Sequence, residues 1–488
     1  MKNITEETLD FKSFEQEIFK IMCRIACELM RIYLELRDMS IMAMRDTKEF
    51  RLVDKRTTTI KTIMGEVTFS RRYYKKKAGG YIFLLDESMG IECGCGLVSE
   101  NLAEQIVMEC TDKSFRKAAG SINSLTGQGI SAMGVWGVFQ KYGKLVEMQT
   151  ARLKELVNSG STGHLGNVQS RVLFEEYDDV WISRQRCKRL KPGEKAQKPR
   201  KKIGKRPMHV GTAYTGWSQS KDGRYQTENK IAYASHGEAS EFTSVFRALL
   251  QNWFDMDGVE RQVVSGDGEG WIRTESELID AILQLDPYHR SEAVIRAIIG
   301  KGEKKMLFDA IDEKDVPRAL DIICDLLMNE QNESAFKKLA KLYGYFYNNR
   351  DILLTWRERG IELPPPPEGI TYRELGTQES SNCNIITQRM KHRKGSWSPE
   401  GANHMAQTLC FKNTIGLDTI LGTLPEPSPT EAWVEPLSAA KAPLHDGKGY
   451  GADWLYAQMP FEQAFRTHGR EAIRGMLRMR PPSELHFI

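Results

Sequence analysis

Two short apolar runs in the centre of the chain each end at an acidic residue. The first begins at Val263 and closes in Gly-Asp-Gly, which supplies Asp267. The second, 281–285, is followed by Asp286 and, three residues later, by His289. Short apolar runs bounded by turn residues predict buried strands. Because open α/β sheets place ligands beyond the carboxyl ends of their strands, we expect these polar side chains at one sheet edge.

The N-terminal part of the chain changes from helical to strand-like periodicity. From residue 6 to about 50, apolar residues recur at helical spacing, as at Ile18 and Met22, which predicts one long amphipathic helix that packs on a partner. Residues 57–74 alternate β-branched and aromatic side chains around Gly65, the pattern of a β-hairpin. Basic residues lie beside tyrosines at the outer end of this hairpin. They indicate either a surface that contacts phosphates or an ordinary solvent-exposed face, and the sequence does not distinguish the two.

Residues 99–149 return to helical spacing and contain a glycine-bearing turn at 126–129. Ser131 is placed to cap the helix that follows. This order is typical of a helix-turn-helix unit, whose second helix would present residues 131–140 to a DNA major groove. A plain scaffold of short helices is the alternative interpretation.

A sheet is predicted in the middle of the chain. Its first three strands form an antiparallel meander at 171–183, 208–217 and 225–234. A helix at 238–253 and the strands ending at Asp267 and Asp286 follow. A meander followed by alternating helix and strand predicts an α/β fold with a mixed sheet, as in the ribonuclease H architecture.

Helical spacing dominates from Arg290 to Leu353, which is too long for a connection and predicts an all-helical insertion. Four prolines at 364–367 follow it as a stiff break. A further helix is predicted to begin near Glu379. Its apolar residues would face the core; they are Ile385, Ile386 and Met390.

These patterns divide the chain into seven segments. An α+β N-terminal region comprises a long helix, a β-hairpin region and a helix-turn-helix-like region, at 1–55, 56–97 and 98–165. The ribonuclease H-like core, the helical insertion, the rest of the core and a C-terminal tail are predicted at 166–289, 290–368, 369–420 and 421–488.

Composition is that of a soluble globular protein: of 488 residues, 40% are hydrophobic and 27% charged. No apolar run approaches the roughly 18 residues of a membrane span, and the N-terminus lacks a signal-peptide core, so we expect a cytoplasmic protein. The nine cysteines are scattered along the chain, and we expect them to be free thiols in a reducing compartment. The net charge is only +4, but 184–206 holds twelve Lys and Arg against one acid, Glu194, which favours a polyanionic partner.

Three acids, Asp178, Asp267 and Glu379, come from positions that a ribonuclease H topology brings together. Converging carboxylates repel one another, so such a set is favoured mainly around a divalent cation. Magnesium prefers oxygen ligands, and two ions about 3.5–4 Å apart can hold the attacking and leaving oxygens of a phosphodiester. Spacing alone is weak support, since 65 acids offer many triples.

Five motifs strengthen this hypothesis because they occur in a fixed order. They are a hairpin at 62–74 followed by Leu84-Leu-Asp-Glu, then Glu176-Tyr-Asp-Asp-Val, Gly266-Asp-Gly-Glu-Gly-Trp-Ile, Asp286-Pro-Tyr-His, and Glu379 with Arg389-Met and Ser396-Trp-Ser. Together they resemble the motifs of DDE transposases of bacterial insertion sequences, specifically the ISLre group of the Mutator-like superfamily. Departures from that pattern are Asp179 and Ser396 in place of glycines and Glu269 in place of an alanine.

The resemblance implies that Asp178, Asp267 and Glu379 are catalytic and hold Mg²⁺ or Mn²⁺, as two ions. Strand alternation lets only one of Asp178 and Asp179 face the metal, and Glu400 is an alternative to Glu379. Asp286 and His289 would support the site by hydrogen bonds or contact DNA.

DNA, as element ends and target, is the implied partner. The residues predicted to contact it are Arg184, Arg186, Lys188, Arg189, Lys198, Arg200, Lys201, Lys202, Lys205, Arg206, Arg389, Lys391 and Arg393. The implied activity is Mg²⁺-dependent strand cleavage and strand transfer by a homodimer or larger assembly on nucleoid DNA. A catalytically inactive transposase-derived DNA-binding protein and a ribonuclease H-like nuclease that cuts without joining are the alternatives.

Overall fold

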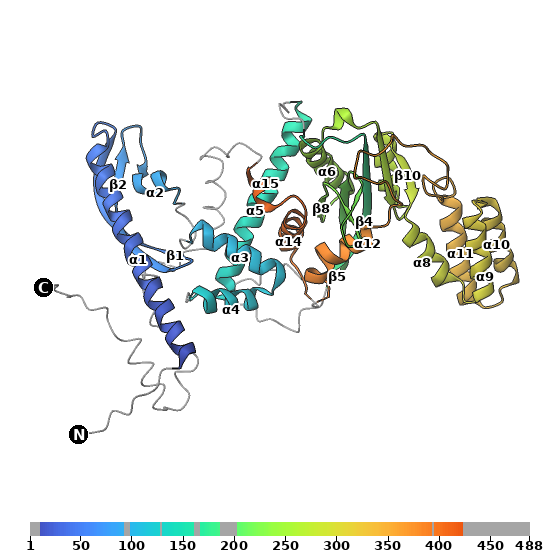
Figure 1. Cartoon of the computed structure of the whole chain (residues 1–488), viewed down its shortest axis with the longest axis horizontal. Helices are drawn as coiled ribbons and strands as arrows, with labels where there is room; N and C mark the ends of the chain where they lie inside the picture. Colours follow the sequence, from blue (N-terminus) through green and yellow to red (C-terminus); the bar gives the residue numbers. More distant parts are fainter. Residues whose placement is uncertain are drawn as a thin grey trace, which may run out of the picture. The chain divides into compact units, whose positions relative to one another are not determined.

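In the computed structural model, the described residues are 10–91, 98–126, 129–160, 166–185, 203–392 and 395–422 (Figure 1). They belong to one unit, 1–425, whereas the second unit, 426–488, lies outside them. Nearly all of the predicted C-terminal tail is therefore outside the description. Within the described part of the chain, no helix is long and apolar enough to cross a membrane.

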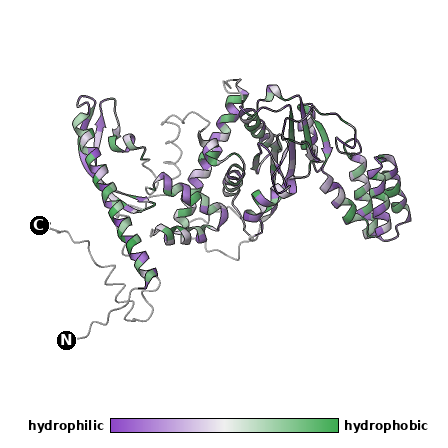
Figure 2. Cartoon of the chain, in the orientation of Figure 1, coloured by the Kyte–Doolittle hydropathy of each residue, from purple (hydrophilic) through white to green (hydrophobic). Residues whose placement is uncertain are grey.

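The long helix and the hairpin predicted from the N-terminal periodicity are both present. The elements here are α1 (Phe11–Met44), β1 (Phe50–Thr62), β2 (Gly65–Lys76), β3 (Tyr81–Ile82) and α2 (Leu84–Met89). Asp10 begins α1 by accepting a hydrogen bond from the backbone N–H of Ser13. One side of α1 packs on β2, and apolar residues also follow the rest of its length (Figure 2). Arg71 and Arg72 form ion pairs within this part of the protein.

Three helices follow the hairpin, as the helical spacing of 99–149 predicts. They are α3 (Glu100–Asp112), α4 (Phe115–Thr126) and α5 (Ala132–Asn158). Ser131 caps α5 as predicted, because its Oγ accepts from the N–H of Gly134 at 3.1 Å. Buried residues of all three helices share one core, which also includes residues of the central sheet.

A five-stranded mixed sheet occupies the centre of the α/β part of the chain. Its strands are β4 (Val172–Arg184), β5 (Ile203–Tyr214), β8 (Ile231–Ser235), β9 (Arg261–Gly266) and β10 (Ile282–Leu285), in the order β10-β9-β4-β5-β8. β5 is antiparallel to β4 and β8, whereas β9 runs parallel to β4 and β10. The two acid-ended strands are therefore neighbours, as predicted.

The prediction of one strand at 225–234 is wrong. The segment is divided into β7 (Tyr225–Thr227), which pairs with β6 (Trp217–Gln219) in a separate ribbon, and β8 in the main sheet. Asn229 lies between them with φ +53°, a left-handed conformation that a continuous strand does not contain. The short polar side chain of asparagine tolerates that conformation, which explains the break.

The two faces of the sheet carry different layers. Tyr177 of β4 packs against Phe242 and Phe246 of α6 (Ala239–Trp253) on one face. Its neighbour Glu176 points to the other face, toward the helices that follow the insertion. α7 (Gly270–Leu278) connects β9 to β10. Alternate residues of β4 therefore reach opposite layers.

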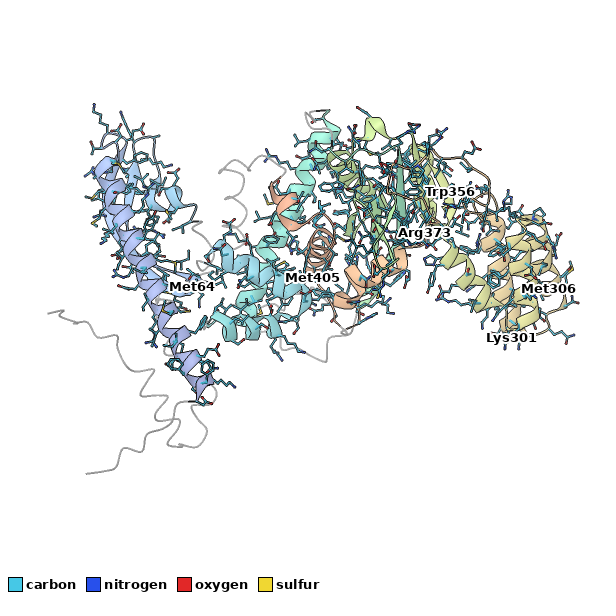
Figure 3. All side chains as sticks on the ribbon, in the orientation of Figure 1. Met64, Lys301, Met306, Trp356, Arg373 and Met405 are labelled. Carbon is cyan, nitrogen blue, oxygen red and sulfur yellow. The ribbon has the colours of Figure 1, made fainter. Side chains whose placement is uncertain are left out.

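The predicted helical insertion consists of four helices with a core of their own. They are α8 (Pro287–Ala297), α9 (Lys301–Asp312), α10 (Val316–Asn329) and α11 (Glu333–Asn348), with Lys301 and Met306 marked in Figure 3. Helical structure ends at Asn348 rather than continuing to Leu353. An irregular segment then follows, in which Trp356 is buried and the Arg373 guanidinium lies 3.9 Å from the ring centroid of Tyr225.

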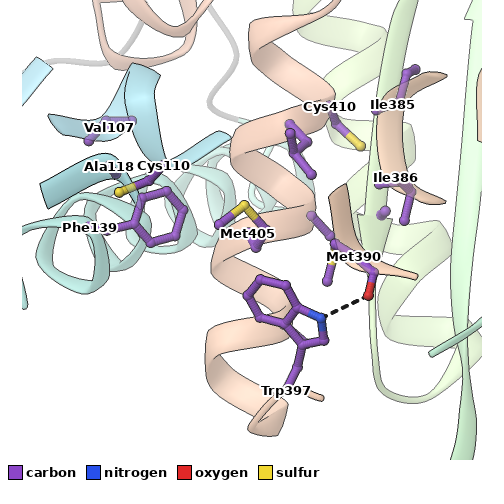
Figure 4. Packing of buried hydrophobic residues seen from close by; sticks show 14 of the residues in the cluster. Val107, Cys110, Ala118, Phe139, Ile385, Ile386, Met390, Trp397, Met405 and Cys410 are labelled. Atoms are coloured by element: carbon purple, nitrogen blue, oxygen red, sulfur yellow. Dashed lines mark hydrogen bonds between the residues drawn. The ribbon is translucent and has the colours of Figure 1, made fainter. Parts of the chain in front are cut away.

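The last described segment returns to the sheet as helices. α12 (Gln378–Ser381), the π-helical turn η2 (Asn382–Thr387) and α13 (Gln388–Met390) follow one another directly, and α14 (Pro399–Lys412) and α15 (Leu417–Gly422) complete the described part. Ile385, Ile386 and Met390 are buried, as predicted. The Trp397 indole N–H donates to the Met390 carbonyl at 3.1 Å and thereby links the segment before α14 to α13 (Figure 4).

Candidate active site

The first two candidate acids on β4 point to opposite faces of the sheet. Asp178 is 8% exposed, and its Oδ2 accepts from Asn382 Nδ2 at 2.6 Å. His289 Nε2 lies 3.6 Å from the other carboxylate oxygen of Asp178. Asp179 instead lies 2.7 Å from Nδ1 of His209 on the α6 face. Of the two acids, Asp178 is thus the one that faces the predicted supporting residues.

Asp267 follows β9, next to the point where β9 leaves β4. The strand register pairs Glu176 with Ser265, so Asp178 and Asp267 each lie two residues further along neighbouring parallel strands. Burial, together with the charges of Glu269 and Asp178, raises the pKa of Asp267 to about 6. These two carboxylates are therefore close enough to repel each other.

The Gly-Asp-Gly turn fits a close contact with the helical insertion. Gly268 has φ +92°, and a Cβ there would lie 2.8 Å from Oδ1 of Asn349. The Tyr345 hydroxyl of α11 donates to the Asp267 carbonyl at 2.9 Å. The insertion therefore braces the backbone that carries Asp267, which accounts for the glycine after this acid.

Asp286 and His289 lie on the first turn of α8, beside these acids. Asp286 is buried and caps α8 by accepting from the N–H of Tyr288 at 2.7 Å. Burial lowers the pKa of His289, but the nearby carboxylate of Asp178, with the charges of Asp286 and Asp267, raises it to about 9 overall. The nearby acidic residues thus favour the protonated form of His289.

Glu176 is a site residue that sequence reasoning missed. It is fully buried, and its carboxylate accepts from the backbone N–H groups of Gly376, Thr377 and Gln378 at 2.9 to 3.1 Å. The hydroxyls of Thr377 and Tyr214 donate to it as well. The carboxylate thus binds the start of α12 and fixes that helix to β4.

Lys230 adds a half-buried amine near the same carboxylate. Its Nζ donates to Ser381 Oγ of α12 at 2.5 Å, and the charge of Glu176 favours its protonated form. Burial has the larger effect and lowers the pKa of Lys230. α12 is therefore held to the sheet by the Glu176 carboxylate at its start, and by Lys230 and the Asn382 amide at its end.

Glu379, the predicted third acid, is exposed on α12. Its charge helps to raise the pKa of Tyr288, after the larger effect of Glu292, so it lies on the α8 side of the site. The buried positions around it are taken by Gln378 and Asn382. The alternative, Glu400, is exposed in the first turn of α14. Of these two glutamates, Glu379 is the one on the helix that leads directly into Asn382, the residue that contacts Asp178.

The donor chemistry of the cluster suits a hard divalent cation. Asp178 and Asp267 offer carboxylate oxygens, which Mg²⁺ and Mn²⁺ prefer, and a cation would relieve their repulsion. In the described part of the chain, no three His, Cys, Asp or Glu side chains stand together in a metal-binding group. The fit therefore concerns the two aspartates, while Glu379 is not gathered with them.

Only some of the residues predicted to contact DNA belong to the part of the chain that the structure describes. Eight lie outside the described residues, namely Arg186, Lys188, Arg189, Lys198, Arg200, Lys201, Lys202 and Arg393. Arg184 is half-buried at the end of β4, whereas Lys205 and Arg206 on β5 are exposed, as is Lys391. Among the described residues predicted to contact DNA, these three cations are therefore the ones whose side chains are exposed to solvent.

Arg389 corrects one of these predictions. It is only 8% exposed, its Nε donates to the Cys110 carbonyl of α3 at 2.8 Å, and its guanidinium lies over the rings of Phe115 and Trp397. A guanidinium held in this way cannot reach a DNA phosphate. Its spacing relative to Lys391 resembled a basic helix end, but the side chain instead joins α13 to the α3–α5 helices.

We therefore expect Arg389→Met to lower the free energy of unfolding by about 2–3 kcal/mol, because a buried carbonyl loses its charged donor. Thermal denaturation measures this loss. Lys391→Met, at an exposed position two residues later, serves as the matched control and should leave the melting temperature unchanged. Equal melting temperatures for the two variants would contradict a structural role for Arg389.

The fold and site thus define a mixed α/β protein with an acidic cluster beside a helical insertion. The model of an uncharacterised protein family, UPF0236, matches residues 4–420, so the chain belongs to this family. A UPF0236 protein of Caldanaerobacter subterraneus subsp. tengcongensis is 23% identical over 433 residues, covering 85% of this chain and 81% of the relative. A UPF0236 protein of Streptococcus gallolyticus, described as lying in the vanSb 3′ region, is 21% identical and covers 82% and 83%.

Among solved structures, similarity is low. A Mos1 transposase paired-end complex with the left transposon end is 11% identical, with a TM-score of 0.13 and coverage of 50% of this chain and 75% of that one. A pre-cleavage Mos1 transpososome is 10% identical, with a TM-score of 0.12 and coverage of 51% and 77%. At these scores the similarity carries no weight for the fold or the site.

Proposed function

We propose that this protein is a DDE transposase of the ISLre group, which binds the ends of an insertion sequence and catalyses metal-dependent DNA cleavage and strand transfer in the bacterial cytoplasm. The order β10-β9-β4-β5-β8, with only β5 running against the other strands, supports a ribonuclease H-like core. The observation that carries the proposal is the convergence of Asp178 and Asp267 on adjacent parallel strands, with His289 beside them.

The residues divide the chemistry among them as follows. Asp178 and Asp267 would hold Mg²⁺, which when bound would neutralise charge on the phosphodiester and activate the attacking oxygen. Glu379 remains the predicted third ligand, although it is exposed on α12 and stands apart from the two aspartates in this structure. Asn382 and His289 hold the Asp178 carboxylate from two sides. Water first breaks a phosphodiester and releases a 3′-hydroxyl, which then displaces the 3′-oxygen of a target phosphodiester. No covalent bond to the protein forms.

The relatives supply a second line of support. The name of one Caldanaerobacter relative joins eleven gene designations of a single strain. A gene that moves by copying or reinsertion produces such multiplicity. The exposed cations Lys205, Arg206 and Lys391 offer phosphate contacts.

Purified protein incubated with labelled DNA carrying the element ends would test the proposal. We expect nicked 3′-hydroxyl ends and joined products with Mg²⁺ or Mn²⁺, and neither product with EDTA. Cleavage without joining would instead identify a nuclease, and metal-indifferent binding without cleavage would identify an inactive DNA-binding protein. Inverted repeats in the nucleotide sequence flanking the gene would provide the DNA ends for this assay.

A further inference from the structure

α1 has two apolar faces, of which the hairpin covers only one. Leu34 and Asp38 are buried against β2, and the Asp38 carboxylate accepts from the backbone N–H of Arg72 at 3.1 Å. Cys27 and Met30 pack against the same core. These contacts fix which side of the helix faces the rest of the described chain.

The opposite side of α1 carries an exposed heptad stripe. We define this stripe as Ile18, Met22, Ile25, Leu29, Ile32 and Leu36. Steps of four and three residues alternate along it, which is the spacing of the seam of a coiled coil. Each of the six is at least 42% exposed, and Leu29 reaches 62%. Single exposed apolar residues are ordinary, but a continuous stripe of this length is typical of an interface.

The flanks of the stripe strengthen this interpretation. Phe14, Phe19, Ile21 and Tyr33 are also exposed and widen the apolar surface. The stripe contains no charged side chain, and Glu28 and Glu35, which flank it, are paired with Arg31 of the same helix. Together these side chains expose on the order of 800 Å² of apolar surface, comparable with the share of one partner in a stable interface.

We propose that the heptad stripe of α1 is a self-association surface, covered by α1 of a second copy of this chain. A heptad seam is complementary to a copy of itself, so a symmetric pair buries the same residues from both partners. The hairpin lies on the opposite side of α1 and leaves the seam accessible. This inference does not depend on catalysis, so it stands or fails separately from the proposed function.

Light scattering coupled to gel filtration of the full-length protein at micromolar concentration tests this proposal. We expect at least twice the chain mass for the wild type. Leu29→Glu should raise the dissociation constant by at least about a hundredfold, because each pairing would bury an unpaired charge. Circular dichroism should show unchanged helix content, since Leu29 is exposed within the single chain.

Arg37→Glu is the matched control, because Arg37 is exposed on α1 outside the stripe. It should leave the measured mass unchanged. A wild-type monomer would overturn the proposal and would indicate that a segment of the same chain or nothing covers the stripe. An oligomer that survives Leu29→Glu would overturn it as well, since assembly would then use another surface.

Discussion

Asp267→Asn is expected to lower the rates of DNA cleavage and strand transfer by at least about a thousandfold, while DNA binding persists. The substitution keeps the size of the side chain but removes one of the two carboxylates that the adjacent parallel strands β4 and β9 bring together. A neutral amide is a weak ligand for Mg²⁺ and leaves the phosphodiester charge uncompensated. Single-turnover cleavage of labelled element ends measures the rate, and a binding assay without metal measures the affinity.

Asp257→Asn is the control, because Asp257 is an exposed acid in the same region of the chain. It should cleave and join at the wild-type rate. Asp178→Asn should be as inactive as Asp267→Asn, whereas Asp179→Asn should retain far more activity because Asp179 faces His209. Full activity in Asp267→Asn would refute the proposed metal-dependent mechanism.

The strands that precede Asp267 and Asp286 could be predicted because a continuous apolar run in the sequence is the pattern that a buried strand requires. The run beginning at Val263 is apolar, short and closed by glycine, and β9 is correspondingly buried between β4 and β10. A parallel strand covered on both faces gives such a continuous pattern. The placement of Asp286 and His289 beside Asp267 followed from the pairing of two consecutive strands.

The contacts that build the rest of the site could not be predicted in the same way. Glu176 binds backbone groups of Gly376 to Gln378, about 200 residues further along the chain, and no local periodicity reports such a contact. A signal was present, since Glu175 and Glu176 stand together inside an apolar strand. Buried acids need partners, and Glu175 finds one in Arg247 on the other face.

Arg389 and Asn229 show two further limits of sequence reasoning. Arg389 has the composition of a DNA contact but packs into a core that only the tertiary fold creates. Asn229 breaks the strand predicted at 225–234 because its backbone adopts a left-handed conformation. In each case a contact or a backbone conformation outweighs the local propensity.

Glu176→Gln is expected to inactivate the protein although it keeps the number and arrangement of heavy atoms in the side chain. Every group around this carboxylate is a donor: three backbone amides and the hydroxyls of Thr377 and Tyr214. A glutamine amide would turn an N–H₂ group against these donors and leave some of them buried without an acceptor. We expect a loss of at least ~3 kcal/mol in the free energy of unfolding, measured by urea denaturation.

The same change also tests whether Glu176 positions α12 for the reaction. If the carboxylate holds α12 and Asn382 against Asp178, the Glu176→Gln protein should lose cleavage even at temperatures where it remains folded. Glu368→Gln, at an exposed position shortly before α12, is the control and should preserve both stability and cleavage. A folded Glu176→Gln protein that cleaves at the wild-type rate would show that the anchoring of α12 serves stability alone, because the acids would then meet the DNA without it.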